Sequence, residues 1–345
     1  MGAPQRTVFG MAGGGDFKEL LGLLASVKGA IDPVIERYIP RSGRPESLFS
    51  SVWDLMDRGG KRFRPALTLL ACEAVGGDPA KAVNAAAAVE LLHNMTLIHD
   101  DIEDGSRFRR GKPCIHVIYG VPTAINSGDA MLIKVFEVAS DGPLPPELKL
   151  KLIRRLAERA FQVTMGQAME FEALSSRDPG DVDVIGILRN KTGALTALAL
   201  ELGAIAGGSH EGELRALARF GESIGIGFQI IDDVLNVDGQ LEKYGKEIGG
   251  DIREGKITVM ASHLARASEP KDKERFLELL GKGDISDEEI GEAIGLYRKY
   301  GSIEFARELA RGFIEEGLRS LEGLPETGAK EKIRALAEFL IRREL

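Results

Sequence analysis

Helical periodicity runs through almost the whole chain, and it restricts the fold more than any other feature of the sequence. Apolar residues recur at the spacing of one helix face, and breaks rich in Gly and Pro, such as residues 76–79 and 178–180, separate the periodic segments. We find no convincing β-hairpin pattern. The segments that we expect to be helical are 16–38, 47–57, 64–75, 79–104, 122–139, 146–174, 181–206, 212–237, 254–267, 271–280, 287–299, 302–322 and 327–343. The sequence therefore predicts an all-α protein.

Two of these segments are too apolar to lie on the surface. Residues 83–92 and 192–206 are rich in Ala and Leu and carry almost no charge, and a helix that is apolar on most sides must be buried. We therefore expect a large helical bundle with an inner layer. Residues 1–15 are rich in Gly and are expected to be a disordered lead-in, whereas residues 16–345, which contain no clear linker, are expected to form a single all-α domain.

Composition excludes several classes of protein. The 345 residues are 43% hydrophobic and 28% charged, as in ordinary globular chains. The net charge of −8, without a basic block, argues against binding of nucleic acid. Cys72 and Cys114 form no CxxC motif and are too few for a disulfide scaffold. No apolar run reaches the roughly 18 residues of a transmembrane helix, and we expect a cytoplasmic protein.

Two acidic clusters of nearly the same form each follow an apolar helical run. They are residues 100–104 (DDIED) and residues 232–236 (DDVLN). On a helix Asp100 and Asp104 would share one face, where their carboxylates repel each other. Either cluster alone could be a solvated helix face, but the apolar runs place both at the inner ends of buried helices, where an unpaired charge is costly. A bound cation explains both clusters, and carboxylate oxygens suit Mg²⁺.

Basic residues gather close to the acidic clusters. Residues 59–65 (GGKRFRP) place glycines and cations before a proline that can open a helix, so backbone amides and cations could converge on an anion. Residues 107–112 follow the first cluster, and Lys243, Lys246 and Lys256 follow the second. Mg²⁺ on carboxylates together with arginine forks suits a polyphosphate. Because neither GxxxxGK[ST] nor a strand-borne GxGxxG is present, a diphosphate that is not a nucleotide is the favoured substrate.

In their order and spacing these motifs resemble the trans-isoprenyl diphosphate synthases, also called polyprenyl synthetases, over residues 59–258. Residues 109–113, 191–192, 228–233 and 245–258 also match family signatures. The resemblance implies a helical bundle around a deep central cavity, the isoprenoid synthase fold. It also implies an enzyme, usually a homodimer, that joins isopentenyl diphosphate head-to-tail to an allylic diphosphate.

The resemblance also implies roles for individual residues. Two Mg²⁺ ions would lie on Asp100, Asp101 and Asp104, and a third would lie on Asp232 and Asp233; Mn²⁺ could substitute. The allylic diphosphate site would be completed by Arg109, Lys191, Thr192, Gln229 and Lys246, with Lys256 as a further substrate-binding residue. The isopentenyl diphosphate pocket would contain Gly60, Lys61, Arg64, His93 and Arg110. Lys191, Lys246 and the five aspartates are the expected catalytic residues.

Two positions depart from the family pattern. Asn236 stands where many members have a third Asp, which could lower the metal affinity of the second cluster. Glu170 stands where Asp is usual, and its longer side chain could shift a solvent or metal contact. Neither departure predicts an inactive enzyme.

In this family the product length depends on side chains one and two turns before the first aspartate, here Met95 and Leu92. Methionine is intermediate in size and flexible, which favours geranylgeranyl diphosphate (C20), the product of an archaeal-type synthase. A product of C25 or longer is the alternative, and Met95 could also be ordinary core packing.

Other functions remain open. Glu90 and His93 form an ExxH motif of the kind found in di-iron bundles, but the second such motif is missing. His99 is interpreted as a packed histidine or one that supports a ligand residue, rather than as a ligand itself. Taken alone, Arg62 and Lys112 are each also compatible with surface charge. An isoprenoid cyclase would share the fold, although residues 232–242 lack its second metal motif. A non-catalytic subunit of a heteromeric synthase would normally have lost the aspartates or arginines that this chain keeps.

Overall fold

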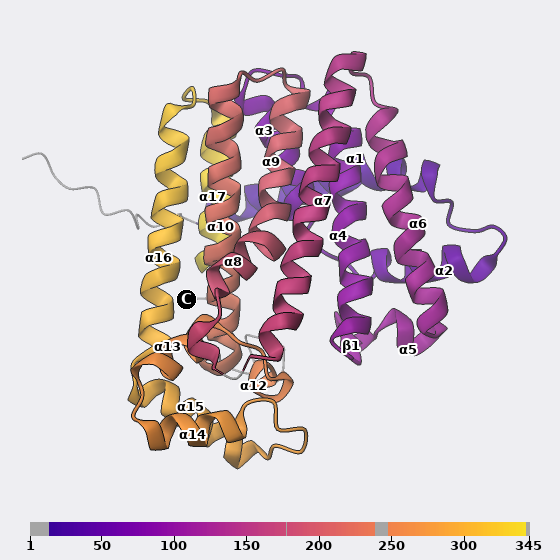
Figure 1. Ribbon diagram of the computed structural model, residues 1–345. Coiled ribbons are helices and arrows are strands. Elements are labelled where there is room, and N and C mark those ends of the chain that lie inside the picture. Colours follow the sequence, from indigo (N-terminus) through magenta and orange to yellow (C-terminus); the bar gives the residue numbers. More distant parts are fainter. Residues whose placement is uncertain (1–13, 177, 239–247, 343–345) are drawn as a thin grey trace, which may run out of the picture.

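The computed structural model describes residues 14–176, 178–238 and 248–342, and long helices make up most of it (Figure 1). The helices of the first half are α1 (Gly14–Tyr38), α2 (Glu46–Asp57), α3 (Phe63–Ala74), α4 (Val83–Glu103), α5 (Ile115–Tyr119), α6 (Val121–Ser140) and α7 (Pro146–Leu174). Those of the second half are α8 (Val184–Leu188), α9 (Ala194–Ala206), α10 (Glu211–Asp238), α12 (Gly250–Glu254), α13 (Val259–Ala267), α14 (Pro270–Leu279), α15 (Asp287–Lys299), α16 (Ser302–Ser320) and α17 (Gly328–Arg342). The all-α prediction is confirmed.

Helix α9 forms the inner layer that its composition predicts. Every residue of α9 is buried, and the helix packs against α3, α4, α7 and α10. Gly203 faces α3, where a Cβ atom would collide with the backbone carbonyl oxygen of Thr68. Glycine therefore permits the close approach of these two helices. Most of α4, the other Ala-rich segment, is buried as well.

Two apolar cores meet along α10. The larger core contains residues of α1 to α7, α9 and the first half of α10, including Phe220 and Ile224. The second core joins the later part of α10, including Ile231 and Val234, to α12 through α16. The sequence did not reveal the role of the helices beyond residue 270. Of these, α17 belongs to the larger core and packs against α3, whereas α14, α15 and α16 support the acidic end of α10. That end leads to α12, at the same end of the bundle as β1 and the last turn of α4 (Figure 1).

A short antiparallel hairpin corrects the prediction that the chain contains none. Strands β1 (Phe108–Arg109) and β2 (Lys112–Pro113) pair across a two-residue turn. Both turn residues have positive φ angles, 53° for Arg110 and 73° for Gly111, as a type I′ hairpin turn requires. Strands of two residues show no alternation of apolar and polar positions, and Arg-Gly is a weaker turn signal than Asn-Gly. The sequence pattern therefore could not reveal the hairpin.

Three predicted helices differ in detail. The segment 79–104 begins with a 3-10 turn before α4, and the segment 181–206 divides into α8, a π-helical turn (Arg189–Gly193) and α9. The helix predicted over 254–267 is wrong at its start, because α12 ends at Glu254 and α13 begins after Thr258. The hydroxyl of Thr258 caps α13 by accepting a hydrogen bond from the backbone N–H of Ala261. Gly255, with φ of 75°, separates the two helices.

The division into a lead-in over residues 1–15 and one domain over residues 16–345 stays a prediction, and residues 1–13 lie outside the described part of the chain. None of the described helices combines the length and the apolar character that crossing a bilayer would require.

Candidate active site

The first acidic cluster forms the last turn of α4. Asp101 is buried, with 1% of its surface exposed, and its Oδ1 atom accepts a hydrogen bond of 2.5 Å from Nε of Arg109 on β1. Its Oδ2 atom is buried and has no hydrogen-bond partner among the described residues. Burial raises the pKa of the neighbouring Asp100 to about 6. The ionised carboxylates at this helix end are therefore destabilised by burial, and a bound cation would offset that cost in free energy.

The second acidic cluster lies near the end of α10. Oδ1 of Asp233 accepts hydrogen bonds from Nζ of Lys256 at 2.7 Å and from Nε2 of Gln229 at 3.1 Å. Its Oδ2 atom, like that of Asp101, is buried and is not hydrogen-bonded to any described residue. Burial lowers the pKa of Lys256, but the carboxylates of Asp233 and Asp251 raise it more, and it lies well above its usual value. Lys256 is therefore a firmly protonated partner of Asp233. We call Oδ2 of Asp101 and Oδ2 of Asp233 the open oxygens.

Asn236 connects the second cluster to α12. Its side-chain Oδ1 atom accepts a hydrogen bond of 3.0 Å from the backbone N–H of Asp251. Its backbone carbonyl oxygen accepts a hydrogen bond of 2.7 Å from the backbone N–H of Gly249. These contacts place the Asp251 carboxylate 3.9 Å from Nζ of Lys256. The departure from a third Asp thus has a structural role in the loop. Asp251 was not among the predicted site residues, although it lies in the matching segment 245–258.

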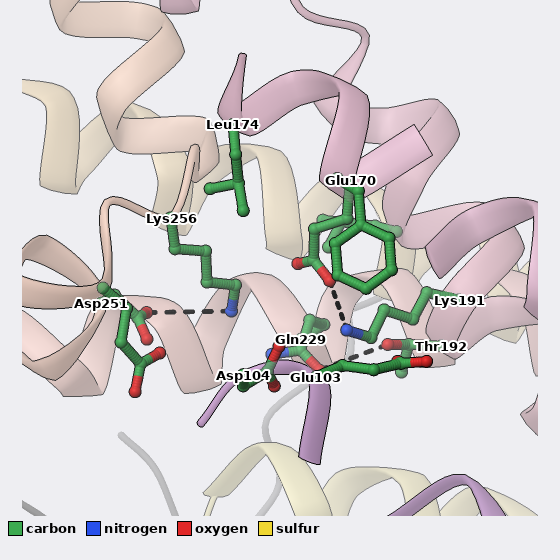
Figure 2. A pocket seen from close by; sticks show the side chains of 12 residues that line it. Glu103, Asp104, Glu170, Leu174, Lys191, Thr192, Gln229, Asp251 and Lys256 are labelled. Atoms are coloured by element: carbon green, nitrogen blue, oxygen red, sulfur yellow. Dashed lines mark hydrogen bonds and ion pairs between the residues drawn. The ribbon is translucent and has the colours of Figure 1, made fainter. Parts of the chain in front are cut away.

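A cavity of about 430 Å³ is lined by Asp104 of the first cluster and by Gln229 and Lys256, which both bond to Asp233 of the second (Figure 2). Lys191 and Lys256 point their ammonium groups into it from opposite sides. Thr192 donates a hydrogen bond of 3.3 Å from its hydroxyl to the side-chain oxygen of Gln229, which joins the π-helical turn to α10. The residues that line the cavity are Glu103, Asp104, Glu170, Phe171, Leu174, Leu188, Lys191, Thr192, Gln229, Asp251, Glu254 and Lys256.

Glu170 holds Lys191 in this cavity. The two side chains form an ion pair that joins α7 to the π-helical turn. Short π-helical turns are often found at functional sites. Gly166, one turn earlier on α7, permits this approach, because a Cβ atom there would lie 2.5 Å from the backbone nitrogen of Lys191. Burial lowers the pKa of Lys191, but Asp100 and Glu170 raise it more, so the net shift is upward. Glu170, the second departure from the family pattern, therefore contacts the ammonium group of Lys191.

The glycine-rich basic segment forms a second cationic site. Nη1 of Arg64 lies 3.3 Å from Nε2 of His93. Burial lowers the pKa of Arg64 to about 10, and burial together with Arg64 lowers the pKa of His93 well below its usual value. Nη1 of Arg110 donates a hydrogen bond of 2.5 Å to the carbonyl oxygen of Gly59, and a Cβ atom on Gly60 would lie 3.2 Å from Nη2 of Arg110.

The structure thus brings Gly60, Arg64, His93 and Arg110 together, with Lys61 exposed on the same segment. Lys246 lies outside the described residues, so its predicted role cannot be placed. Glu90 of the ExxH motif is paired with Arg62 rather than directed at a second histidine. His99 packs against Gly128 of α6, where a Cβ atom would collide with its ring.

Within residues 14–176, 178–238 and 248–342, no group of three or more His, Cys, Asp or Glu side chains is arranged to hold a metal ion by itself. The donor set nevertheless fits Mg²⁺, since each acidic cluster offers an open oxygen of the carboxylate type that this ion prefers. Mg²⁺ usually retains several ligands that are not protein groups, and diphosphate oxygens can supply them. The residues fit a metal that is shared with a bound diphosphate.

Comparison with known proteins agrees with this geometry. A family model described as Polyprenyl synthetase matches residues 45–297. The chain belongs to the polyprenyl synthetase family. The synthetase is therefore a transferase of the trans-isoprenyl diphosphate synthase type. The family membership that the sequence motifs indicated is confirmed.

Individual relatives carry different product names. A short chain isoprenyl diphosphate synthase of Methanothermobacter thermautotrophicus is 40% identical over 302 residues, which cover 87% of this chain and 91% of that protein. A geranylfarnesyl diphosphate synthase of Natronomonas pharaonis is 34% identical over 316 residues, with coverage of 87% and 91%. The crystal structure of a geranylgeranyl pyrophosphate synthetase from Pyrococcus horikoshii matches with a TM-score of 0.90 and 37% identity, covering 95% of this chain and 99% of that one. This last match confirms the isoprenoid synthase fold.

Proposed function

We propose that the synthetase condenses isopentenyl diphosphate with allylic diphosphates of C5 to C15 and releases all-trans geranylgeranyl diphosphate (C20), with Mg²⁺ as its metal. One observation carries the proposal: both acidic clusters present an open oxygen beside a chain cation, and Asp104 and Lys256 line one cavity of about 430 Å³. Such a constellation suits an anion that arrives together with divalent metals.

The allylic diphosphate would bind in the cavity of Figure 2. Asp100, Asp101, Asp104, Asp232 and Asp233 would hold the metal, which supplies positive charge to the leaving diphosphate when it is bound. Arg109 already pairs with Asp101, Lys256 with Asp233 and Lys191 with Glu170. These three cations would donate to the diphosphate oxygens. Thr192 and Gln229, joined by their own hydrogen bond, would complete the site.

The isopentenyl diphosphate would bind at the glycine-rich basic segment. Arg64 and Arg110 offer guanidinium forks, and Lys61 offers an exposed ammonium group. His93 would be neutral at neutral pH, since its pKa is lowered by burial and by Arg64. Its Nε2 would then accept a hydrogen bond from Nη1 of Arg64, and the other donors of that guanidinium would serve the substrate.

The proposed prenyl transfer requires no protein nucleophile. When the allylic C–O bond breaks, negative charge grows on the departing diphosphate, and preorganised cations stabilise it. The double bond of isopentenyl diphosphate then attacks the allylic cation, which requires both substrates within near-attack distance and the exclusion of water. By resemblance to the family, the released diphosphate would remove the final proton.

Product length would be limited beside α4. Met95 and Leu92 are both buried, with 8% and 1% of their surfaces exposed, and lie on α4 before Asp100. A methionine at this position would stop elongation near C20 while retaining some adaptability. The similarity to a geranylgeranyl synthetase supports C20, and the similarity to a geranylfarnesyl synthase keeps C25 as the second candidate.

A homodimer is the proposed assembly. Helices α5 and α6 expose apolar side chains that a monomer would leave in contact with water: Val117, Ile118, Val121, Ile125 and Ile133. Light scattering during size-exclusion chromatography would give the mass directly, and a monomeric mass at micromolar concentration would contradict the proposed dimer.

Turnover of matched alanine variants tests the metal assignment. Asp100→Ala and Asp232→Ala should each reduce incorporation of labelled isopentenyl diphosphate by at least about 100-fold, since each removes a group that stabilises leaving-group charge. Circular dichroism should be unchanged. The control is Asp287→Ala, whose side chain is 98% exposed on α15 and should leave turnover intact. Near-normal rates in both site variants would refute the assignment.

A further inference from the structure

We propose that Arg62 is a positioning residue for the isopentenyl diphosphate pocket: it holds residues 59–64 in the shape that presents Lys61 and Arg64, and it does not touch the substrate. The inference rests on the proposed function of that pocket. It concerns a residue that the sequence motif places among the basic site candidates, but that the structure places in the interior, with 2% of its surface exposed.

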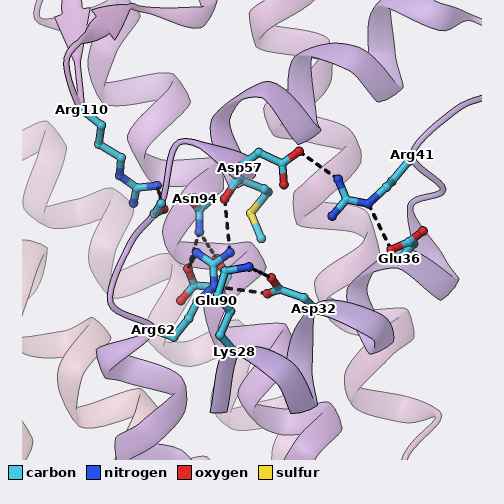
Figure 3. Close-up of polar contacts among 11 residues, drawn as sticks. Lys28, Asp32, Glu36, Arg41, Asp57, Arg62, Glu90, Asn94 and Arg110 are labelled. Atoms are coloured by element: carbon cyan, nitrogen blue, oxygen red, sulfur yellow. Dashed lines mark hydrogen bonds and ion pairs between the residues drawn. The ribbon is translucent and has the colours of Figure 1, made fainter. Parts of the chain in front are cut away.

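The guanidinium of Arg62 is bound from three helices (Figure 3). Nη1 donates a hydrogen bond of 2.8 Å to Oε1 of Glu90 on α4, and Nη2 donates one of 3.3 Å to the carbonyl oxygen of Met56 on α2. Nε donates one of 3.3 Å to Oδ1 of Asp32 on α1. Each nitrogen of the guanidinium group therefore has an acceptor, and the group cannot turn toward a ligand without losing them.

Glu90 is itself fixed in place. It is 3% exposed, and its Oε1 atom also accepts a hydrogen bond of 2.9 Å from Nδ2 of Asn94, one turn later on α4. Asn94 is fully buried and donates a second bond of 2.8 Å to the carbonyl oxygen of Glu90. A buried ion pair with these additional hydrogen bonds is rigid, and loss of one partner leaves an uncompensated charge. Arg62 is therefore tied to the same helix that carries the first acidic cluster.

The backbone of this segment needs such an anchor. Gly59, Gly60 and Arg62 have φ angles of 98°, 124° and 52°. A non-glycine residue at positive φ is disfavoured by contact of its Cβ atom with the backbone. Strained conformations of this kind persist when the surrounding structure fixes them. The three-helix contact of the Arg62 side chain supplies that constraint at the N-cap residue, directly before α3.

Arg110 shows the contrast. A Cβ atom on Gly60 would lie 3.1 Å from Nη1 of Arg62 and 3.2 Å from Nη2 of Arg110, so the two guanidinium groups flank the same glycine. Arg110 is exposed and bonded to main-chain carbonyls, whereas Arg62 is buried and bonded to carboxylates. One arginine of the pair is available to an anion and the other shapes the segment that binds it.

The test measures KM separately for the two substrates. Arg62→Met should raise KM for isopentenyl diphosphate by about tenfold or more, the loss expected when binding groups are misplaced by about 1 Å, and should leave KM for the allylic diphosphate within about twofold. Arg62→Lys, which keeps the charge but not the fork, should recover only part of the affinity. The surface control is Arg41→Met, whose side chain pairs with Glu36 and Asp57 and should affect neither KM.

A double variant separates positioning from general stability. Arg62→Met leaves Glu90 buried and unpaired, whereas Arg62→Met combined with Glu90→Gln removes both charges and should recover most of the lost stability. We expect KM for isopentenyl diphosphate to stay high in the double variant. Recovery of a normal KM together with stability would overturn the proposal, as would an equal rise in both KM values. If Arg62→Met does not fold, the double variant and Asp32→Asn give the same comparison.

Variants of Arg64 and Arg110 distinguish failure of this inference from failure of the proposed function. Arg64→Met and Arg110→Met should each raise KM for isopentenyl diphosphate, because both guanidinium groups would touch it. If they do so and Arg62→Met does not, Arg62 has no positioning role. If all three leave that KM unchanged, the pocket itself is wrongly assigned. Titration calorimetry with isopentenyl diphosphate alone gives the same comparison without turnover.

Discussion

Nζ of Lys256 lies 2.7 Å from Oδ1 of Asp233, while the second oxygen of that carboxylate is buried and open. Arg109 and Asp101 repeat the arrangement at the other acidic cluster, at 2.5 Å. In both places a cation expected to bind diphosphate is paired with a carboxylate expected to bind metal. If metal and diphosphate bind together, the carboxylates bind the metal and the cations bind the diphosphate, so every charge keeps a partner. If only one of them binds, one side chain of each pair loses its partner.

This relationship predicts that Mg²⁺ and inorganic diphosphate stabilise the protein cooperatively. The rise in the unfolding midpoint with both present should exceed the sum of the separate rises, because ligands that bind the folded state better together add a coupling free energy. Differential scanning fluorimetry measures the three shifts. Asp233→Asn should lose most of the coupling, and purely additive shifts in the unaltered protein would contradict the idea.

Asn236→Ala should loosen the connection between α10 and α12. The variant loses the acceptor for the backbone N–H of Asp251, and we expect it to lower the free energy of unfolding by about 1 kcal/mol and to raise KM for the allylic diphosphate. Asn236→Asp keeps an oxygen acceptor at the same place and should retain most of both properties. Urea titration and steady-state kinetics give the two values. Equal behaviour of the two variants would mean that the hydrogen bond does not matter.

Met95 predicts opposite changes in product length. Met95→Ala should lengthen the product by about one isoprene unit or more, because removal of a large side chain opens space beside α4. Met95→Phe should shorten it by filling that space. Chromatography of the dephosphorylated products shows both shifts. If neither variant changes the product, Met95 is only core packing and the cavity floor lies elsewhere.

His93 predicts a pH dependence of stability with a definite sign. Because the pKa of His93 in the folded protein lies well below 6.5, the unfolded chain takes up a proton as the pH falls through 6.5 and the folded chain does not. Stability from this group is therefore present above pH 6.5 and is lost below it. Between pH 7.5 and 5.5 the unaltered protein should lose about 1 kcal/mol more than His93→Gln. Urea titrations at the two pH values measure the difference, and parallel losses would show that His93 titrates normally.

The features that follow from repeated local patterns could be predicted from the sequence. These features are the apolar faces of the long helices, the burial of α9 and the placement of both acidic clusters at helix ends. Each depends on residues that lie close together in the chain. The family motifs then allowed the site residues to be proposed. The structure brings most of these residues around one cavity and one basic segment.

The remaining features depend on contacts between distant segments. Arg62 looks like its neighbours Lys61 and Arg64 in sequence, and only the approach of Glu90 and Asp32 from two other helices buries it. Asn236 looks like a missing metal ligand until its bond to Asp251 is seen. The close approach of Gly166 to the backbone of Lys191 likewise joins two segments that are distant in the chain. Tertiary contacts of this kind carry no periodic signature.

The most direct measurement is the product pattern of the purified protein with Mg²⁺, labelled isopentenyl diphosphate and, in separate reactions, the C5, C10 and C15 allylic diphosphates. We predict prenyl alcohols that end at C20 after dephosphorylation with every starter, and no product without metal. Products of C25 or longer would contradict the proposed limit at Met95. A folded protein that elongates none of the starters would contradict the assignment of the two acidic clusters as one prenyl transfer site.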